Sequence, residues 1–213
     1  MKFYKYLGLV LTNTGKFNAA RKKLYDKGLK ASFKFYKNIK SCSPSIKTLL
    51  HIFDHTIKPI ALYGCEIWGM LNLTPKRRAM HLFEIFKDWE PDKLNLKFCK
   101  YVLGVSKNCT NIGVISELGR FPLYINIVIQ MFMYWHRLEN SPTDLLSDAY
   151  IESSSDKAVA NQSWYANIKF FSEKLGLNLA LCKKLSKNKF KILLRKCIKT
   201  DFLTYWSHQK DLI

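Results

Sequence analysis

Apolar and basic positions run in parallel along residues 16–40. The apolar residues recur at steps of three, four or their sum, which is the spacing of one helical face. Five lysines recur at steps of four, three, four and three, and at 100° per residue their stripe lies roughly a quarter to a third of a turn from the apolar one. The apolar set is Phe17, Ala20, Leu24, Ala31, Phe35 and Ile39, and the basic set is Lys23, Lys27, Lys30, Lys34 and Lys37. The pattern predicts a long helix with one buried face and one basic face.

The same pattern returns near the C-terminal end, in a helix expected over about 180–200. Its apolar positions are Phe190, Leu193, Leu194, Cys197 and Ile198. Its basic positions are Lys184, Lys187, Lys191, Arg195 and Lys199. Each basic stripe has two interpretations, a contact to phosphates or a solvated face, and acidic residues would normally intersperse a solvated face.

The remaining segments also read as mainly helical, with one exception at the start. Residues 3–11 are aromatic and β-branched and are followed by a turn signal at 13–15, which predicts one strand with little room for a second. A lone strand is not stable, so it either pairs within this chain or has lost its sheet. Further helices are expected over about 45–71 (kinked or divided at Pro59), from Pro75 to about 88, and over 92–103, 109–119, 122–138, 141–151 and 157–175.

These segments suggest three regions. Residues 1–15 form a strand and a turn, residues 16–152 form a helical domain, and residues 153–213 form a basic helical extension after a linker at Ser153–Ser155. The expected fold class is therefore mainly α, a helical bundle with a short N-terminal strand or hairpin.

The net charge of the chain indicates which class of molecule it binds. The 213 residues include 35 Lys plus Arg and 16 Asp plus Glu, a formal charge of +19, and 48% are hydrophobic. Residues 1–60 carry a net +11, residues 61–150 a net +1 and residues 151–213 a net +7. Such an excess indicates an anionic partner, nucleic acid first and a membrane surface second. The aromatic fraction of 14% excludes a disordered tail.

The sequence shows little catalytic or metal-binding chemistry. It has no Asp-Asp pair, no phosphate-binding glycine loop, and six cysteines without zinc-ligand spacing. His51 and His55 share a helical face but have no evident third ligand, and the acids at 88–92 surround Pro91, which favours a helix boundary. No secretory signal and no membrane span is evident, so we expect an intracellular protein with reduced thiols.

An ordered series of short motifs adds a resemblance. The motifs are Tyr6-Leu7-Gly8, Leu62-Tyr63-Gly64-Cys65-Glu66-Ile67-Trp68-Gly69, Phe98-Cys99-Lys100 with Leu103-Gly104-Val105, Glu117-Leu118-Gly119-Arg120-Phe121-Pro122-Leu123, and Tyr134-Trp135 with Arg137-Leu138. Trp164, Leu175-Gly176-Leu177, Asp201-Phe202 and Trp206 continue the series. The series resembles the region after the catalytic palm in reverse transcriptases of non-LTR (LINE-type, jockey-like) retrotransposons, and it spans about residues 3–206.

The resemblance implies a thumb-like fragment of an RNA-directed DNA polymerase. Such a thumb holds the template–primer, so the implied partners are RNA or an RNA/DNA duplex backbone and the palm of the parent polymerase, with no membrane and no small-molecule substrate. The family's catalytic aspartates have no counterpart here, so no catalytic residue and no enzyme activity is expected. Mg²⁺ is expected only for the missing palm, whose strands would also account for an unpaired strand at residues 3–11. Met1 is then an internal methionine of the ancestral frame.

The resemblance also assigns roles to single residues. By similarity, the lysines from Lys23 to Lys37 and Arg120 are expected to contact phosphates, and Glu66 is a candidate partner for Arg120. The other motif residues are expected to be structural: Tyr6, Leu7, Gly8, Tyr63, Gly64, Glu66, Trp68, Glu117, Leu118, Gly119 and Pro122. Tyr63, Ile67 and Trp68 suit a buried seam. Tyr134 and Trp135 either stack on bases or, as their apolar helix favours, pack in the core.

Three functions remain open at this point. The chain is a nucleic-acid-holding thumb remnant, a helical scaffold that binds a partner protein, or a truncated retroelement product without a function. An active polymerase would require carboxylates that the sequence lacks.

Overall fold

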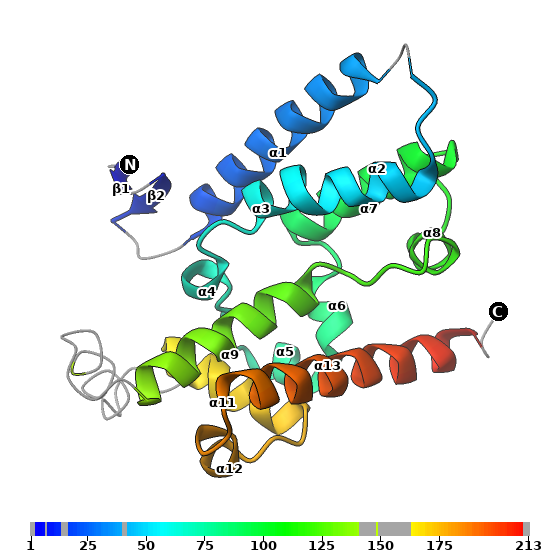
Figure 1. The fold of residues 1–213 in the computed structure, drawn as a ribbon. Helices are drawn as coiled ribbons and strands as arrows, with labels where there is room; N and C mark the ends of the chain where they lie inside the picture. The colour runs from blue at the N-terminus through cyan, green and yellow to red at the C-terminus, as the bar shows by residue number, and fades with distance from the viewer. Residues whose placement is uncertain are drawn as a thin grey trace. The chain divides into compact units, whose positions relative to one another are not determined.

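The computed structural model describes residues 3–6, 8–13, 17–39, 42–140, 148 and 163–210. The fold is mainly helical with a short N-terminal two-stranded hairpin, which confirms the predicted fold class (Figure 1). In chain order the elements are β1 (Phe3–Tyr6), β2 (Leu9–Thr12), α1 (Asn18–Asn38), α2 (Ile46–Ile52), the π-helix η1 (Phe53–Ile57), α3 (Lys58–Ala61), α4 (Cys65–Trp68), α5 (Pro75–Ala79), α6 (Leu82–Phe86), α7 (Glu90–Leu103), α8 (Asn111–Glu117), α9 (Tyr124–Asn140), α11 (Trp164–Lys174), α12 (Leu179–Lys183) and α13 (Lys187–Lys210).

The chain forms two compact units, each built from two stretches of sequence. The first comprises Met1–Gly64 and Phe86–Tyr124, and the second comprises Cys65–Ile85 and Ile125–Ile213. Residues 65–85 and 125–140 therefore share a unit with 163–210. The expected helix at 141–151 and linker at Ser153–Ser155 fall outside the described residues, apart from Asp148, which is helical. The predicted boundary after residue 152 falls there too, and the three predicted regions stay a prediction.

The N-terminal strand pairs within this chain. β1 and β2 are antiparallel, from Phe3 opposite Thr12 to Tyr6 opposite Leu9. Gly8 has a φ of +89°, a conformation that glycine adopts without steric cost and that a two-residue connection favours. The expectation of a single strand is therefore wrong, and no partner strand from a missing palm is needed to explain it.

In the first unit, α1 packs on α7 through its predicted face. Ala20 and Leu24 are buried, and so are Gly28 and Ser32 on the same side of the helix. A Cβ placed on Gly28 would lie 2.5 Å from Leu94 Cδ2, so a larger residue here would force the Leu94 side chain to move. The small side chains at the contact let the two helices come close together.

The expected division near Pro59 takes the form of a π-helix. Proline cannot donate a backbone hydrogen bond, and its ring clashes with the carbonyl four residues earlier. η1 precedes Pro59, and the Lys58 N–H donates to the Phe53 carbonyl five residues back. The wider turn accommodates the proline without ending the helical path, as single π-turns do.

In the second unit, α9 and α13 run side by side in opposite directions (Figure 1). Phe190 of α13 packs against Phe132 and Trp135 of α9, with ring centroids 6.2 and 5.9 Å apart. Leu194 and Ile198 continue the buried stripe of α13 that the sequence predicts. The single helix expected over 180–200 is wrong, since α12 ends at Lys183 and α13 begins at Lys187.

The six cysteines form no disulfide in the structure. Cys65, Cys99 and Cys182 are buried, and burial raises the pKa of the Cys99 thiol to about 11, so it stays protonated at neutral pH. Within the described residues, no helix has the length and apolar character needed to cross a membrane.

Candidate nucleic-acid interface

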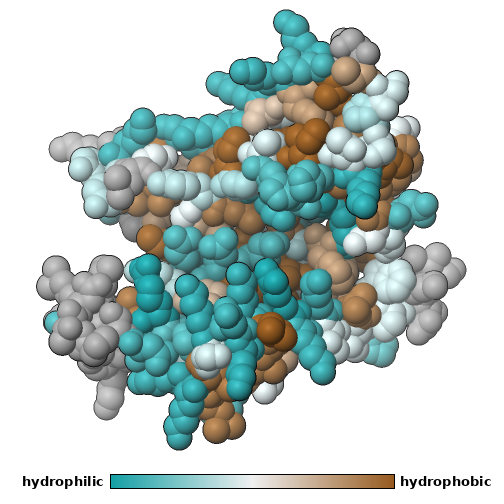
Figure 2. Space-filling view, viewed as in Figure 1, coloured by the Kyte–Doolittle hydropathy of each residue, from teal (hydrophilic) through white to brown (hydrophobic). Residues whose placement is uncertain are grey.

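The five predicted lysines of α1 form one exposed stripe. Lys23, Lys27, Lys30, Lys34 and Lys37 are all exposed, and they lie beside the buried positions of the same helix. At a rise of about 1.5 Å per residue the stripe is about 21 Å long. Figure 2 shows hydrophilic side chains projecting around the outer end of α1, at the top of the view.

These lysines carry charge that the described part of the chain does not neutralise. The structure pairs none of the five with a carboxylate among the described residues, and Asp26 is the only acid on α1. Neighbouring like charges at helical spacing repel one another, so the stripe is stabilised by any polyanion that lies along it.

The C-terminal basic set divides between two elements. Lys187, Lys191 and Arg195 are exposed and lie on one side of α13, while Lys184 is exposed at the end of α12. The neighbouring Lys183 is neutralised, because its Nζ lies 2.8 Å from Glu139 Oε2. The described residues show no such partner for Lys187, Lys191 or Arg195. The hydrophilic surface in the lower part of Figure 2 lies over this region.

The start of α13 is held in place by the end of α9. His136 is buried, and its Nε2 lies 2.9 Å from the Leu185 carbonyl. The Asn140 amide donates to the His136 carbonyl and to the Lys183 carbonyl. The bonds to the Leu185 and Lys183 carbonyls supply partners for acceptors at the α12–α13 junction, where helix ends leave backbone carbonyls without partners in the helix.

A set of residues on α9 that the sequence prediction missed faces the α13 stripe. Asn126, Ile129, Gln130 and Met133 line a hollow of about 260 Å³ together with Lys187, Lys191 and Arg195. The signal was present in the sequence. Asn126, Gln130, Met133, Arg137 and Asn140 recur at steps of four, three, four and three along a largely apolar helix.

Arg120 does not have the role that the resemblance implies. Its guanidinium makes two hydrogen bonds to Asp54, at 2.8 and 3.3 Å, and its side chain is only 10% exposed. It also lies over the Phe53 ring, and Lys58 Nζ lies 2.9 Å from the same carboxylate. The expected partner Glu66 is therefore wrong, and a guanidinium held in this way is not available to phosphates.

The ion pair with Arg120 and Lys58 lowers the pKa of the Asp54 carboxyl group. Burial alone would raise the pKa of Asp54, but the hydrogen bonds from Arg120 and Lys58 outweigh it and keep the pKa below its usual 3.8. A carboxyl whose pKa is depressed by folding stabilises the folded state above its usual pKa. That contribution is lost as the pH falls below 3.8.

Replacing Arg120 with Met should lower the free energy of unfolding by about 1.5–3 kcal/mol at neutral pH, because two charge-assisted hydrogen bonds are lost. The loss should shrink in acid, where Asp54 becomes protonated. Urea unfolding of Arg120→Met, Asp54→Asn and the double variant measures the coupling directly. Additive effects of the two substitutions would show that the pair contributes nothing.

Asp92 organises the same unit from inside the core. It is 3% exposed, and its two carboxylate oxygens accept hydrogen bonds from the backbone N–H groups of Leu123 and Tyr124, at 2.5 and 3.2 Å. Leu123 directly precedes α9 and Tyr124 is its first residue, and both belong to the first unit, as Asp92 does. N–H groups at the start of a helix have no partner within it. Asp92, the last acid of the 88–92 cluster, therefore caps a helix that begins 32 residues later. That cluster marks a helix boundary as expected, since α7 begins at Glu90 with Pro91 in its first turn.

The motif residues that the structure describes mostly make structural contacts. Tyr63 lies against Gly8, 3.5 Å from where a Cβ on that glycine would be. A Cβ on Gly64 would lie 2.9 Å from Leu9 Cδ1, and Gly64 has a φ of +69°. The Tyr6-Leu7-Gly8 and Tyr63-Gly64 motifs therefore meet at the hairpin. Leu7 itself is outside the described residues.

Other motif residues mark helix ends. Gly119 has a φ of +59° and ends α8, with the Arg120 N–H donating to the Ile115 carbonyl as in a Schellman motif. Pro122 is buried, Leu118 is half-buried and Glu117 is exposed.

The Tyr63–Trp68 segment matches the buried-seam prediction only in part. Trp68 is fully buried, but Tyr63 and Ile67 are 51% and 42% exposed, so for these two the prediction is wrong. The helix expected there breaks at residues 62–64, and Tyr63 and Ile67, four residues apart, lie on the exposed side of this segment. Trp135 is buried, as expected for the core, whereas Tyr134 is only half-buried.

The described residues contain no cluster of three or more His, Cys, Asp or Glu side chains that could hold a metal ion. His51 and His55 are both exposed on neighbouring turns, with ring centroids 4.0 Å apart. No known protein family, curated protein or solved structure matches the chain.

Proposed function

We propose that this chain is a thumb-like, non-catalytic part of a reverse transcriptase of a non-LTR retrotransposon, and that it holds an RNA/DNA template–primer by its phosphate backbone. The proposal rests on one observation above the others. α1 presents five exposed lysines on one straight stripe, with no carboxylate of the described residues paired to them. A lysine binds phosphate as a point charge and reads no base sequence, which suits a surface that grips a duplex of any sequence.

The packing of α1 supports the proposal. The buried face of α1 is fixed on α7 by Leu24 and Gly28, so the lysine stripe lies on a rigid helix rather than on a loop. A rigid array of charges loses less entropy on binding than a flexible one. Arg120 is not part of this interface, because Asp54 holds its guanidinium.

Binding of a labelled RNA/DNA duplex across a salt series tests the proposal. Phosphate contacts give an affinity that falls steeply with salt, with a slope of about −0.9 per contact. Binding that is weak and independent of salt would contradict the proposal. Incorporation of nucleotides by the purified chain would contradict its non-catalytic part.

A further inference from the structure

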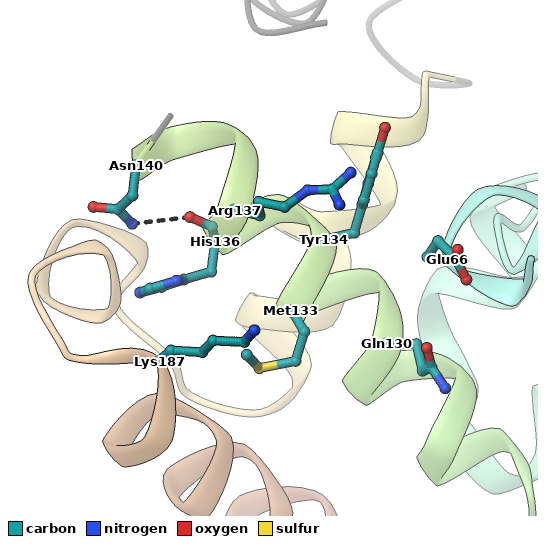
Figure 3. A pocket seen from close by; sticks show the side chains of 8 residues that line it. All are labelled: Glu66, Gln130, Met133, Tyr134, His136, Arg137, Asn140 and Lys187. Carbon is teal, nitrogen blue, oxygen red and sulfur yellow. Dashed lines mark hydrogen bonds between the residues drawn. The ribbon is translucent and has the colours of Figure 1, made fainter. Parts of the chain in front are cut away.

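A second polar surface lies in the other unit, on the groove between α9 and α13. Two adjoining hollows of about 560 and 260 Å³ share Gln130, Met133 and Lys187, so they form one continuous groove. The larger one is also lined by Glu66, Tyr134, His136, Arg137 and Asn140 (Figure 3). We propose that this groove binds a single-stranded segment of RNA or DNA. The proposal does not depend on duplex binding by α1.

The charge of the groove favours a polyanion. Lys187, Lys191 and Arg195 follow one another at steps of four along α13, about 6 Å apart along the helix axis. Arg137 adds a fourth cation from α9, and Glu66 is the only carboxylate among the described residues that line the groove. The three α13 cations neighbour the buried stripe of the same helix, so they stand at the edge of the α9 contact rather than on the outer face.

The α9 wall supplies groups that a phosphate chain alone does not need. Gln130 is exposed and Asn126 is half-buried, and both line the groove. Side-chain amides pair with the donor and acceptor edges of bases, and a single strand exposes these edges where a duplex hides them. The amides therefore favour a single strand over a duplex backbone and over an acidic peptide.

The far end of the groove offers a flat surface. The Arg137 guanidinium carbon lies 4.9 Å from the centre of the Tyr134 ring, and the ring meets Trp164 edge to face at 5.6 Å. Figure 3 shows Arg137 directed toward Tyr134 and away from Lys187. Guanidinium planes and aromatic rings are the surfaces on which unpaired bases stack. His136 has a different task, because its bond to the Leu185 carbonyl positions the α13 wall.

The experiment measures binding of fluorescein-labelled oligo(U) to the full chain by anisotropy across a salt series. The test variant is Lys187→Gln with Lys191→Gln. Its matched control is Lys189→Gln with Lys196→Gln, which removes the same charge from exposed positions of α13 outside the groove. Each phosphate contact on a single strand contributes about 0.7 to the slope of log affinity against log salt. The groove variant removes two such contacts, so the slope should become shallower by about 1.4. The control should leave the slope unchanged, and an equal reduction in the two variants would overturn the proposal.

A neutral substitution tests the amide wall separately. Gln130→Ala should weaken oligo(U) binding by about 2- to 13-fold without changing the salt slope, the range expected for one hydrogen bond. Unchanged affinity would overturn the role given to Gln130. Displacement of oligo(U) by polyglutamate as readily as by unlabelled oligo(U) would instead identify the groove as a docking site for acidic peptides.

The proposal that α1 binds a duplex and the proposal that the groove binds a single strand are contradicted by different results. Changing Lys23, Lys27, Lys30 and Lys34 of α1 to Gln should weaken RNA/DNA duplex binding and spare oligo(U). The groove variant should weaken oligo(U) binding and spare the duplex. If the groove variant loses duplex binding and oligo(U) binding to the same extent, the groove acts only as part of a general basic surface. That result would overturn the inference. Loss of duplex binding alone in the α1 variants leaves the groove result unaffected.

Discussion

Changing Lys23, Lys27, Lys30 and Lys34 together to Gln should nearly abolish the salt dependence of duplex binding. The four side chains are exposed on one stripe of α1. If each contacts one phosphate, the slope of log affinity against log salt falls by about 3.6, at about 0.9 per contact. Between about 50 and 200 mM salt, the wild-type protein should then lose about 150-fold more affinity than the variant. The measurement is anisotropy of a labelled RNA/DNA duplex.

The control for this experiment removes the same charge from scattered positions. Lys47, Lys76, Lys93 and Lys107 are exposed and lie outside α1, so their change to Gln gives a protein of equal net charge. We expect the control to reduce the slope by far less than the α1 variant. Equal slopes would mean that the formal charge of +19 attracts nucleic acid as a whole and that α1 is not an interface.

Local periodicity predicted the elements that carry these surfaces. The spacing of Ala20 and Leu24 gave the buried face of α1, and Phe190, Leu194 and Ile198 gave that of α13. Pro91 marked the start of α7. Each of these signals acts within one helix, where residues three and four apart share a face by geometry alone.

The features that the sequence did not yield depend on distant partners. Arg120 is bound to Asp54, 66 residues away, and no local pattern distinguishes a buried guanidinium from one that contacts phosphate. At the break between α12 and α13, the Leu185 and Lys183 carbonyls are bonded by His136 and Asn140, which lie 49 and 43 residues earlier in the chain. Local periodicity carries no signal of partners so distant. The polar stripe of α9 could be read from its spacing, but only the packing of α9 on α13 places it opposite Lys187 and Lys191.

The hairpin shows a different limit. The turn signal at 13–15 suggested one strand over residues 3–11. The structure instead has two four-residue strands within residues 3–12, joined by two residues. Among the described residues of the connection, Gly8 marks the reversal through its φ of +89°. A single strand would have left two explanations, pairing within this chain or a sheet lost with a missing palm. Closure of the hairpin within this chain removes that argument, so the proposed origin rests on the motif series and the α1 stripe.

Replacing Asp92 with Ala should cause a large loss of stability. The buried N–H groups of Leu123 and Tyr124 would lose the carboxylate that accepts their hydrogen bonds, and each unsatisfied buried donor costs about 1–3 kcal/mol. We therefore expect the free energy of unfolding to fall by about 2–6 kcal/mol, measured by urea unfolding. Asp88→Ala is the matched control, because Asp88 is an exposed acid of the same segment and its loss should cost no more than about 0.5 kcal/mol.

Asp92 also predicts a pH dependence of opposite sign to that of Asp54. Burial raises the pKa of the Asp92 carboxyl to about 7, although the Leu123 and Tyr124 N–H groups act to lower it. A group whose pKa is raised by folding contributes stability below its usual pKa of 3.8, and this contribution is lost as the pH rises toward 7. The stability difference between wild type and Asp92→Asn, which stays neutral, should therefore move against the wild type across this window, by at most about 1.4 kcal/mol per pH unit. A difference that instead favours the wild type increasingly with pH would mean that the two N–H groups outweigh burial and that Asp92 is held as a carboxylate.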